Sequence, residues 1–302
     1  MSAKRLLVTG AAGFVGRLVA EFAVARGHDV LGLDRRAPAV PVPGGRFVEA
    51  DIRDRAAVRD AVAGVDAIVH CAAIVGPKPA NADPALATEV NVTGTLAVLE
   101  AARATSTPVV NLSTATLYGN RPDTAPLDET APTDPVGIYD ATKLMAETLC
   151  DAYRKTFGVA VASFRTSFVY GAQHSTGDYF VERALAGETE IDDVGRDHPC
   201  DFTYVRDLAL GLVQAAEAGP LPEPVYNLSG GVLRTRGDLG GIVASHFPGL
   251  TIRQAPGVDP GRHLRGVCLI ERAGRDFGYR PAFTLETGIA DWIARVRGEI
   301  AA

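Results

Sequence analysis

The strongest chemical signal in the sequence is a tyrosine followed four residues later by a lysine, Tyr139 and Lys143. Residues four apart lie on one face of a helix, so the phenol and the ammonium are expected side by side. A phenol with a pKa of about 10 is a poor base at neutral pH. A lysine beside it, with the positive charge of an oxidised nicotinamide, would lower that pKa. The spacing also arises by chance, and taken alone it fits a surface helix pair better.

A strand upstream of this pair ends in two hydroxyl side chains, Ser113 and Thr114. A hydroxyl at that point could polarise a substrate oxygen. A glycine-rich loop near the N-terminus, this hydroxyl pair, and the tyrosine and lysine follow one another along the chain. This order indicates that they take part in one reaction.

Three glycines, Gly10, Gly13 and Gly16, follow the first strand and open the first helix. Gly10 permits a tight turn, Gly13 lets the backbone approach a pyrophosphate, and Gly16 allows close packing of helix on strand. The helix N-terminus favours the phosphate charge. Glycines in this context predict a dinucleotide site, although a glycine triplet alone would be weak evidence.

The choice between NAD and NADP depends on Asp34, which ends the next strand about 20 residues after the loop. An acidic side chain there can accept hydrogen bonds from the ribose and repel a 2′-phosphate, which favours NAD. Arg35 is the counter-argument, because a guanidinium can accommodate the extra phosphate. Asp51 and Ile52 are expected to meet the adenine ring, and a solvated acidic loop is the alternative.

The first half of the chain alternates short apolar runs with helical patterns. Such alternation is typical of βαβ units, so we predict an α/β fold, a Rossmann-type doubly wound parallel sheet with helices on both faces. Ligands bind such sheets beyond the carboxyl ends of the strands. Strands are predicted at residues 5–9, 30–34, 47–50, 67–71, 109–113 and 159–164, and helices at 14–26, 56–63, 86–105 and 139–157.

The pattern loosens after about residue 165, where glycine, proline and acidic residues predict irregular chain at 171–177, 187–199 and 248–261 before a helix at 285–296. We therefore expect a smaller C-terminal substrate-binding lid domain. The predicted division is 1–166 for the NAD-binding domain, with about 203–245 returning to it, and 167–302 mainly for substrate binding.

The composition of the 302 residues excludes several classes of protein. The net charge is −6, and Arg35-Arg36 is the only tight basic cluster, so no nucleic-acid binding is expected. No apolar run approaches the roughly 20 residues of a membrane span, and a strand follows the N-terminus directly, so we expect no membrane anchor and no signal peptide. The four cysteines have neither disulfide nor zinc spacing. These features predict a reduced, cytoplasmic protein without a metal site.

Five further segments complete a resemblance to a known family. They are His70-Cys71-Ala72-Ala73, Asn91-Val92-Thr93-Gly94-Thr95, Ser113 to Gly119, Tyr139-x-x-x-Lys143 and Asp201-Phe202-Thr203-Tyr204-Val205-Arg206-Asp207. With the glycine loop they cover about two-thirds of the chain, and the whole resembles the extended short-chain dehydrogenase/reductases, the NAD-dependent sugar-nucleotide epimerases and dehydratases.

The resemblance implies a role for each matching residue. Tyr139 would be the acid/base, Lys143 would orient the nicotinamide ribose and lower the phenol pKa, and Thr114 would hold the reacting oxygen. Ser113 is then expected to be structural. Cofactor contacts are expected from Gly10, Ala12, Gly13, Phe14, Val15, Gly16, Asp34, Arg35, Asp51, Ile52, Cys71, Ala72, Ala73, Asn91, Leu112, Tyr139, Lys143 and Phe168, and substrate contacts from Ile74, Thr114, Thr116, His174, Arg262 and Arg265.

Two departures from the family pattern bear on the reaction. Family dehydratases carry Asp-Glu where this chain has Ala115-Thr116, which resembles the 4-epimerases instead. Sugar-nucleotide members have an asparagine where this chain has Phe168, and a basic residue where it has Cys200. A guanidinium of Arg262 or Arg265 could still hold a phosphate or a carboxylate.

The expected function is therefore an NAD-dependent sugar 4-epimerase acting on a nucleotide sugar or a similar polyol. The alternative is a dehydrogenase or ketoreductase acting on a non-nucleotide hydroxy compound or sugar acid. A non-catalytic dinucleotide sensor is a third reading, which the three catalytic residue types disfavour. His70 is expected to matter through its backbone, and His198 to be an ordinary loop histidine. Alanine-rich helices at 86–105 and 139–157 predict a homodimer.

Overall fold

The computed structural model describes residues 2–42, 44–172 and 180–300. Its centre is a seven-stranded parallel sheet in the order β11-β6-β5-β4-β1-β2-β3. The chain builds outward from β1 to β3, then returns to the other side of β1 with β4, so the order reverses between β1 and β4. The strands are β1 (Arg5–Thr9), β2 (Asp29–Asp34), β3 (Arg46–Glu49), β4 (Ala67–His70), β5 (Val109–Thr114), β6 (Val161–Thr166) and β11 (Val225–Asn227).

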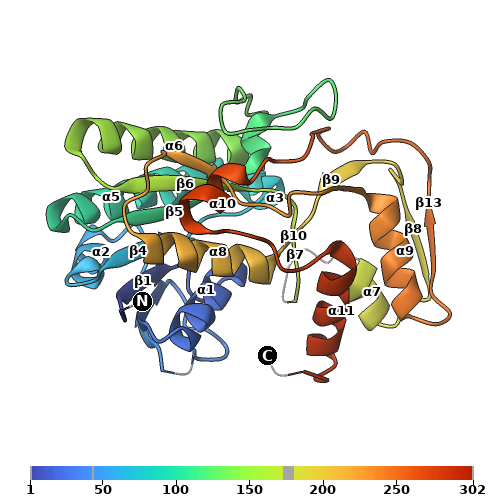
Figure 1. The fold of residues 1–302 in the computed structure, drawn as a ribbon, viewed down its shortest axis with the longest axis horizontal. Coiled ribbons are helices and arrows are strands. Elements are labelled where there is room, and N and C mark those ends of the chain that lie inside the picture. Colours follow the sequence, from blue (N-terminus) through green and yellow to red (C-terminus); the bar gives the residue numbers. More distant parts are fainter. Residues whose placement is uncertain (1, 43, 173–179, 301–302) are drawn as a thin grey trace.

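Helices cover both faces of this sheet (Figure 1). Side chains alternate along a strand, so Leu6 and Val8 belong to one hydrophobic core and Leu7 to the other. The first core includes α1 (Phe14–Ala25) and α8 (Val205–Ala218), which pack against each other. The second includes α2 (Arg55–Val62), α5 (Gly94–Thr105) and α6 (Ile138–Phe157). The prediction of a doubly wound parallel α/β sheet is confirmed.

The helix predicted at 86–105 is wrong as a single regular element. The chain forms α3 (Pro77–Ala82) and α4 (Pro84–Thr88), then a π-helical turn, η1 (Glu89–Thr93), and only then α5. A π turn inserts an extra residue into the helical ladder and is frequent at functional sites. Here it carries Asn91 into the interior, where that side chain is 1% exposed.

The remaining elements form a smaller group at one side of the sheet (Figure 1). Its two-stranded pairs are β7 (Val169–Tyr170) with β10 (Thr203–Tyr204), β8 (Glu190–Asp193) with β13 (Thr251–Gln254), and β9 (Pro199–Asp201) with β12 (Leu233–Thr235). The helices of this group are α7 (Phe180–Leu185), α9 (Arg236–His246) and α11 (Leu285–Val296), whereas α10 (Glu271–Phe277) packs against β11 and α8.

The irregular stretches predicted at 187–199 and 248–261 are corrected in part, because they contain β8 and β13. Only Ile191 of β8 is buried, while Glu190 and Asp192 face outward and pair with Arg253 of β13. After β10 the chain returns to the main sheet with α8 and β11, whereas α9 packs against β13 and α11. The division into two domains stays a prediction. Among the described residues, no helix is long and apolar enough to cross a membrane.

Candidate active site

A cavity of about 550 Å³ opens at the carboxyl ends of β1, β4 and β5, where the strand order reverses. An open α/β sheet binds ligands at such a switch point. Of the residues singled out from the sequence, those that line this cavity are Gly10, Gly13, Phe14, Val15, Gly16, Asp34, Arg35, Asp51, Ile52, Cys71, Ala72, Ala73, Ile74, Leu112, Thr114, Thr116, Tyr139, Lys143, Phe168 and Arg265.

Several lining residues were not foreseen from the sequence, and most are direct neighbours of predicted ones. The loop after β4 continues to line the cavity beyond Ile74, and the end of β6 contributes two hydroxyl side chains. A rule extending each strand-end motif by two residues would have found most of them. They are Leu33, Ala50, Val75, Gly76, Pro77, Val90, Ala115, Thr166, Ser167 and Val169, and Ser113, which was expected to be structural, also lines the cavity.

The glycine loop is shaped so that side chains would fill it. Gly10 has a φ of +70°, and a Cβ there would lie 2.7 Å from the backbone nitrogen of Ala72. A Cβ on Gly16 would overlap the carbonyl oxygen of Gly10. The helix α1 begins after Gly13, which has no side chain to cap it. A close approach of backbone to ligand at a helix N-terminus fits a pyrophosphate, so these residues fit a dinucleotide.

Asp34 has a structural contact as well as a place in the cavity wall. Its Oδ2 accepts a hydrogen bond from the backbone nitrogen of Ala12 at 3.1 Å, which ties the glycine loop to β2. Ala12 itself is not among the lining residues, and its contact with the cofactor stays a prediction. Asp51 is engaged by Arg53, whose guanidinium lowers the pKa of the Asp51 carboxyl.

Asn91 does not line the cavity, and its role as a cofactor contact stays a prediction. Its Oδ1 accepts from the Ile74 backbone nitrogen at 2.7 Å, and its Nδ2 donates to the Ile74 carbonyl at 3.1 Å. The same Nδ2 donates to Thr142 Oγ1 at 2.9 Å. The π turn therefore presents an amide that binds the loop after β4 to α6.

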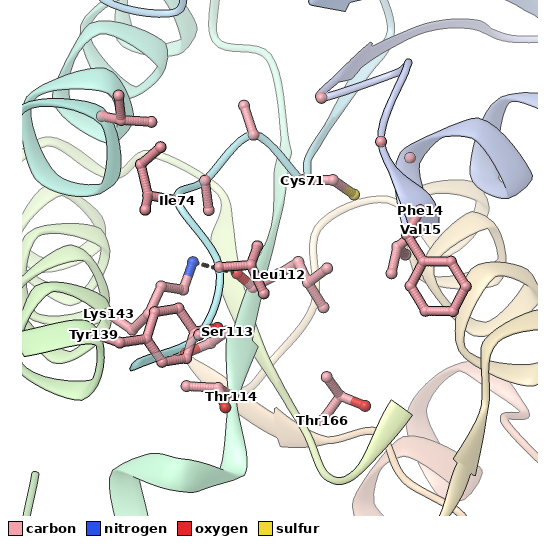
Figure 2. A pocket seen from close by; sticks show the side chains of 18 of the residues that line it. Phe14, Val15, Cys71, Ile74, Leu112, Ser113, Thr114, Tyr139, Lys143 and Thr166 are labelled. Atoms are coloured by element: carbon pink, nitrogen blue, oxygen red, sulfur yellow. Dashed lines mark hydrogen bonds between the residues drawn. The ribbon is translucent and has the colours of Figure 1, made fainter. Parts of the chain in front are cut away.

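The three candidate catalytic side chains are brought together in the cavity wall, where all are buried (Figure 2). Thr114 ends β5, and its Oγ1 lies 3.0 Å from that of Thr116. Tyr139 and Lys143 lie on α6, one turn apart. Burial raises the pKa of Tyr139 to about 12, and a hydrogen bond with Thr114 opposes that rise.

Lys143 is directed differently from the sequence expectation. Its Nζ donates to the Leu112 carbonyl of β5 at 2.7 Å, as Figure 2 shows, and no hydrogen bond joins it to the Tyr139 phenol. Burial lowers the pKa of Lys143. Four-residue spacing places both on one face of the helix but does not fix the direction of a long side chain. Lys143 therefore acts on the phenol through space and not by a direct hydrogen bond.

Several groups behind the catalytic residues have polar partners, although Nη1 of Arg165 is buried without one. Ser113 donates to Glu147 Oε2 at 3.2 Å, and Glu147 pairs with Arg165 at 3.0 Å. His70 lies between two threonine hydroxyls, and burial lowers its pKa to about 3, so its imidazole is neutral. Burial raises the pKa of Cys71 to about 12, which keeps its thiol protonated.

The far end of the cavity is lined by Thr116, Phe168 and Arg265. Arg262 does not line it, and its role as a substrate contact stays a prediction. The Nε of Arg262 pairs with Asp259 at 3.0 Å, and its guanidinium covers the Phe168 ring at 5.5 Å. His174 lies outside the described residues. His198 is buried away from the cavity wall.

This chain is similar in sequence and in structure to several known enzymes. A dTDP-4-dehydrorhamnose reductase of Mycolicibacterium smegmatis is 32% identical over 76% of this chain and 65% of that relative. A 3-beta-hydroxysteroid dehydrogenase of Mycolicibacterium neoaurum is 29% identical over 95% of this chain and 90% of the relative. The crystal structure of Thermus thermophilus UDP-glucose 4-epimerase in complex with NAD has a TM-score of 0.84 and 30% identity, covering 98% of this chain and all of that chain.

The family model for NAD-dependent epimerases and dehydratases matches residues 6–229. That span runs from β1 to the residues just after β11 and holds nearly the whole cavity wall. The resemblance seen in the sequence is confirmed, and with it NAD as the cofactor of the family. The chain belongs to the NAD-dependent epimerase/dehydratase family.

Proposed function

We propose that this protein is an NAD-dependent 4-epimerase of a sugar or a similar polyol that oxidises a substrate hydroxyl and then reduces the resulting ketone from the other face. One observation carries the proposal: Thr114, Tyr139 and Lys143 line the same cavity as the glycine loop. A dinucleotide held by that loop can extend along the cavity to the hydroxyl-bearing end.

The side chains then divide the work of proton transfer. When bound, NAD supplies the acceptor for the hydride and, once reduced, its donor. Thr114 Oγ1 holds the substrate oxygen by a hydrogen bond, and the Tyr139 phenolate takes the hydroxyl proton as the C–H bond breaks. On return, the Tyr139 phenol gives that proton back to the ketone oxygen. The positive charge of the buried Lys143 ammonium, one turn away on α6, stabilises the Tyr139 phenolate electrostatically.

Epimerisation is preferred to dehydration because the residues after Thr114 carry no acid. Ala115 and Thr116 both line the cavity, and neither can protonate a leaving hydroxyl as a carboxylic acid would.

A net dehydrogenase or ketoreductase acting on a non-nucleotide hydroxy compound is the second candidate. Phe168 favours it, because this apolar ring lines the cavity where the family resemblance leads one to expect an asparagine. Two of the relatives described above bear the names of a reductase and a dehydrogenase.

The fate of the cofactor distinguishes the two candidates. The purified protein is denatured, and the released dinucleotide is identified by mass spectrometry. The native protein is then incubated with nucleotide sugars and with free sugars and sugar acids. An epimerase converts one sugar to its epimer without net formation of reduced cofactor, whereas a dehydrogenase forms one reduced cofactor per product. Bound dinucleotide with no turnover of any substrate would contradict both.

We further propose that the protein is a cytoplasmic homodimer. The helix α6 leaves Met145 and Phe157 about half-exposed, at 49% and 52%. The four cysteines are unpaired, as in a reducing compartment. Light scattering coupled to size-exclusion chromatography tests the dimer, and a monomeric mass at micromolar concentration would contradict it.

A further inference from the structure

Three cationic side chains line the cavity within the described chain: Arg35, Lys143 and Arg265. Arg35 lies beside Asp34 at the end expected for adenosine. Lys143 is occupied by the Leu112 carbonyl. Arg265 is therefore the one cation available at the end of the cavity that holds Thr116 and Phe168.

Arg265 forms no ion pair with any described residue, and the carboxylate that acts on its guanidinium is that of Asp140. The hydrogen bond of Arg265 to the Gly119 carbonyl is long, at 3.4 Å. Burial lowers the pKa of its guanidinium. A half-buried guanidinium that forms no ion pair is incompletely compensated, so a site of this kind is suited to receive an anion.

The backbone around Arg265 is held on both sides. Leu264 accepts from the Arg121 backbone nitrogen at 2.8 Å, and Cys268 donates to Asp201 Oδ2 at 2.9 Å. Between them, Gly266 packs so closely on the loop at Ala125 that a Cβ would overlap its carbonyl oxygen. The backbone that carries Arg265 is thus fixed before any ligand arrives, which reduces part of the entropic cost of binding.

The neighbours of Arg265 add no second positive charge to the cavity. Arg262 is neutralised by Asp259 and lies outside the wall, over the Phe168 ring. The Phe168 ring also packs against Phe202 in a T-shaped arrangement, with ring centroids 5.2 Å apart. Phe168 is therefore held as an apolar wall with no hydrogen-bond donor in its side chain.

We propose that Arg265 receives the single carboxylate of a compact polyhydroxy acid, an aldonate or a uronate, whose hydroxyl is the reacting group. The inference rests on the proposed function, since it names the substrate class of the same site. A guanidinium matches one carboxylate with two parallel hydrogen bonds. A diphosphate carries more charge and more acceptor atoms than one guanidinium beside an apolar wall can satisfy.

Binding is measured by calorimetry on the wild-type protein saturated with NAD. The probes are D-glucuronate, D-galacturonate, D-gluconate and D-threonate, with D-glucose as the uncharged match and UDP as the diphosphate. We expect at least one acid to bind at least about tenfold more tightly than both D-glucose and UDP.

Two variants of the same segment locate the charge. Arg265→Gln should weaken binding of that acid by about 10- to 100-fold while leaving NAD affinity unchanged. Arg262→Gln, three residues away and outside the cavity, should change it by less than about threefold. Circular dichroism checks that both variants are folded.

Three outcomes would overturn the inference: UDP binding more tightly than every acid, no acid binding at all, or equal losses in the two variants. The proposed hydride transfer would survive any of them, because calorimetry reports binding and not turnover. That function fails on a different result, the absence of cofactor-dependent conversion of every substrate in the activity screen.

Discussion

Replacing Asn91 by alanine removes a buried amide that does not line the cavity but is hydrogen-bonded to the loop that does. The side chain makes three hydrogen bonds, two to the Ile74 backbone and one to Thr142. At a net value of about 1 kcal/mol for each, Asn91→Ala should lower the free energy of unfolding by about 3 kcal/mol. Urea denaturation followed by tryptophan fluorescence measures this loss, because Trp292 is fully buried.

The same variant separates two roles for Asn91. If it acts only through the loop after β4, NAD affinity measured by calorimetry should fall by less than about tenfold, since the loop is loosened but its lining residues remain. Thr235→Ala is the matched control. It removes the cap of α9, far along the chain from the cofactor residues, and should cost about 1 kcal/mol with no change in NAD affinity.

The reasoning would be refuted by the opposite pattern. Unchanged stability of Asn91→Ala, together with a loss of NAD affinity of about 100-fold or more, would mean that the amide contacts the cofactor directly. The interpretation that Asn91 acts only by holding the loop after β4 would then be wrong.

Three further predictions concern the cofactor loop and a buried carboxyl group. Asp34→Asn keeps an oxygen that can accept from the Ala12 backbone nitrogen but removes the negative charge. The preference for NAD over NADP, measured by paired titrations, should therefore fall by about tenfold or more. Equal affinities of the wild type for NAD and NADP would refute the role of Asp34 at the ribose. Gly16→Ala should weaken NAD binding and lower the free energy of unfolding by about 1–3 kcal/mol, because its Cβ overlaps the Gly10 carbonyl oxygen. Gly241→Ala is the control, since a Cβ there meets open space, and it should be neutral or stabilising. Equal effects of the two substitutions would contradict the packing argument. Burial raises the pKa of Asp201 from 3.8 to about 6, so the folded chain holds the extra proton in this range, and the stabilisation present below pH 3.8 is lost as pH rises through 6. The stability of the wild type relative to Asp201→Asn should therefore fall by about 3 kcal/mol between these values, and a flat difference would contradict the raised pKa.

The sheet and the cavity wall could be predicted because their signals are local. The strand at Arg5–Thr9 and the helix at Leu285–Val296 follow directly from hydrophobic periodicity. The carboxyl ends of parallel strands meet at one edge, so motifs at the ends of β1, β4 and β5 had to converge there. No pairing of distant segments was needed for that inference.

Other features depend on contacts that the sequence does not encode locally. The strand β8 buries only Ile191, so its pattern resembles a loop until β13 pairs with it. Arg262 and Arg265 are alike in sequence, and only the position of Asp259 and the wall of the cavity separate them. The direction of Lys143 likewise depends on a carbonyl of β5, 31 residues away along the chain.

The central claim is that Tyr139 carries the proton in a reaction coupled to hydride transfer, and its most direct test is the turnover of Tyr139→Phe. The ring and its packing remain, and only the phenol oxygen is removed. With saturating NAD and a substrate turned over by the wild type, the variant should be slower by roughly 10²–10⁴-fold, with NAD affinity and folding unchanged. Turnover within about threefold of the wild type in the folded variant would show that another group carries the proton.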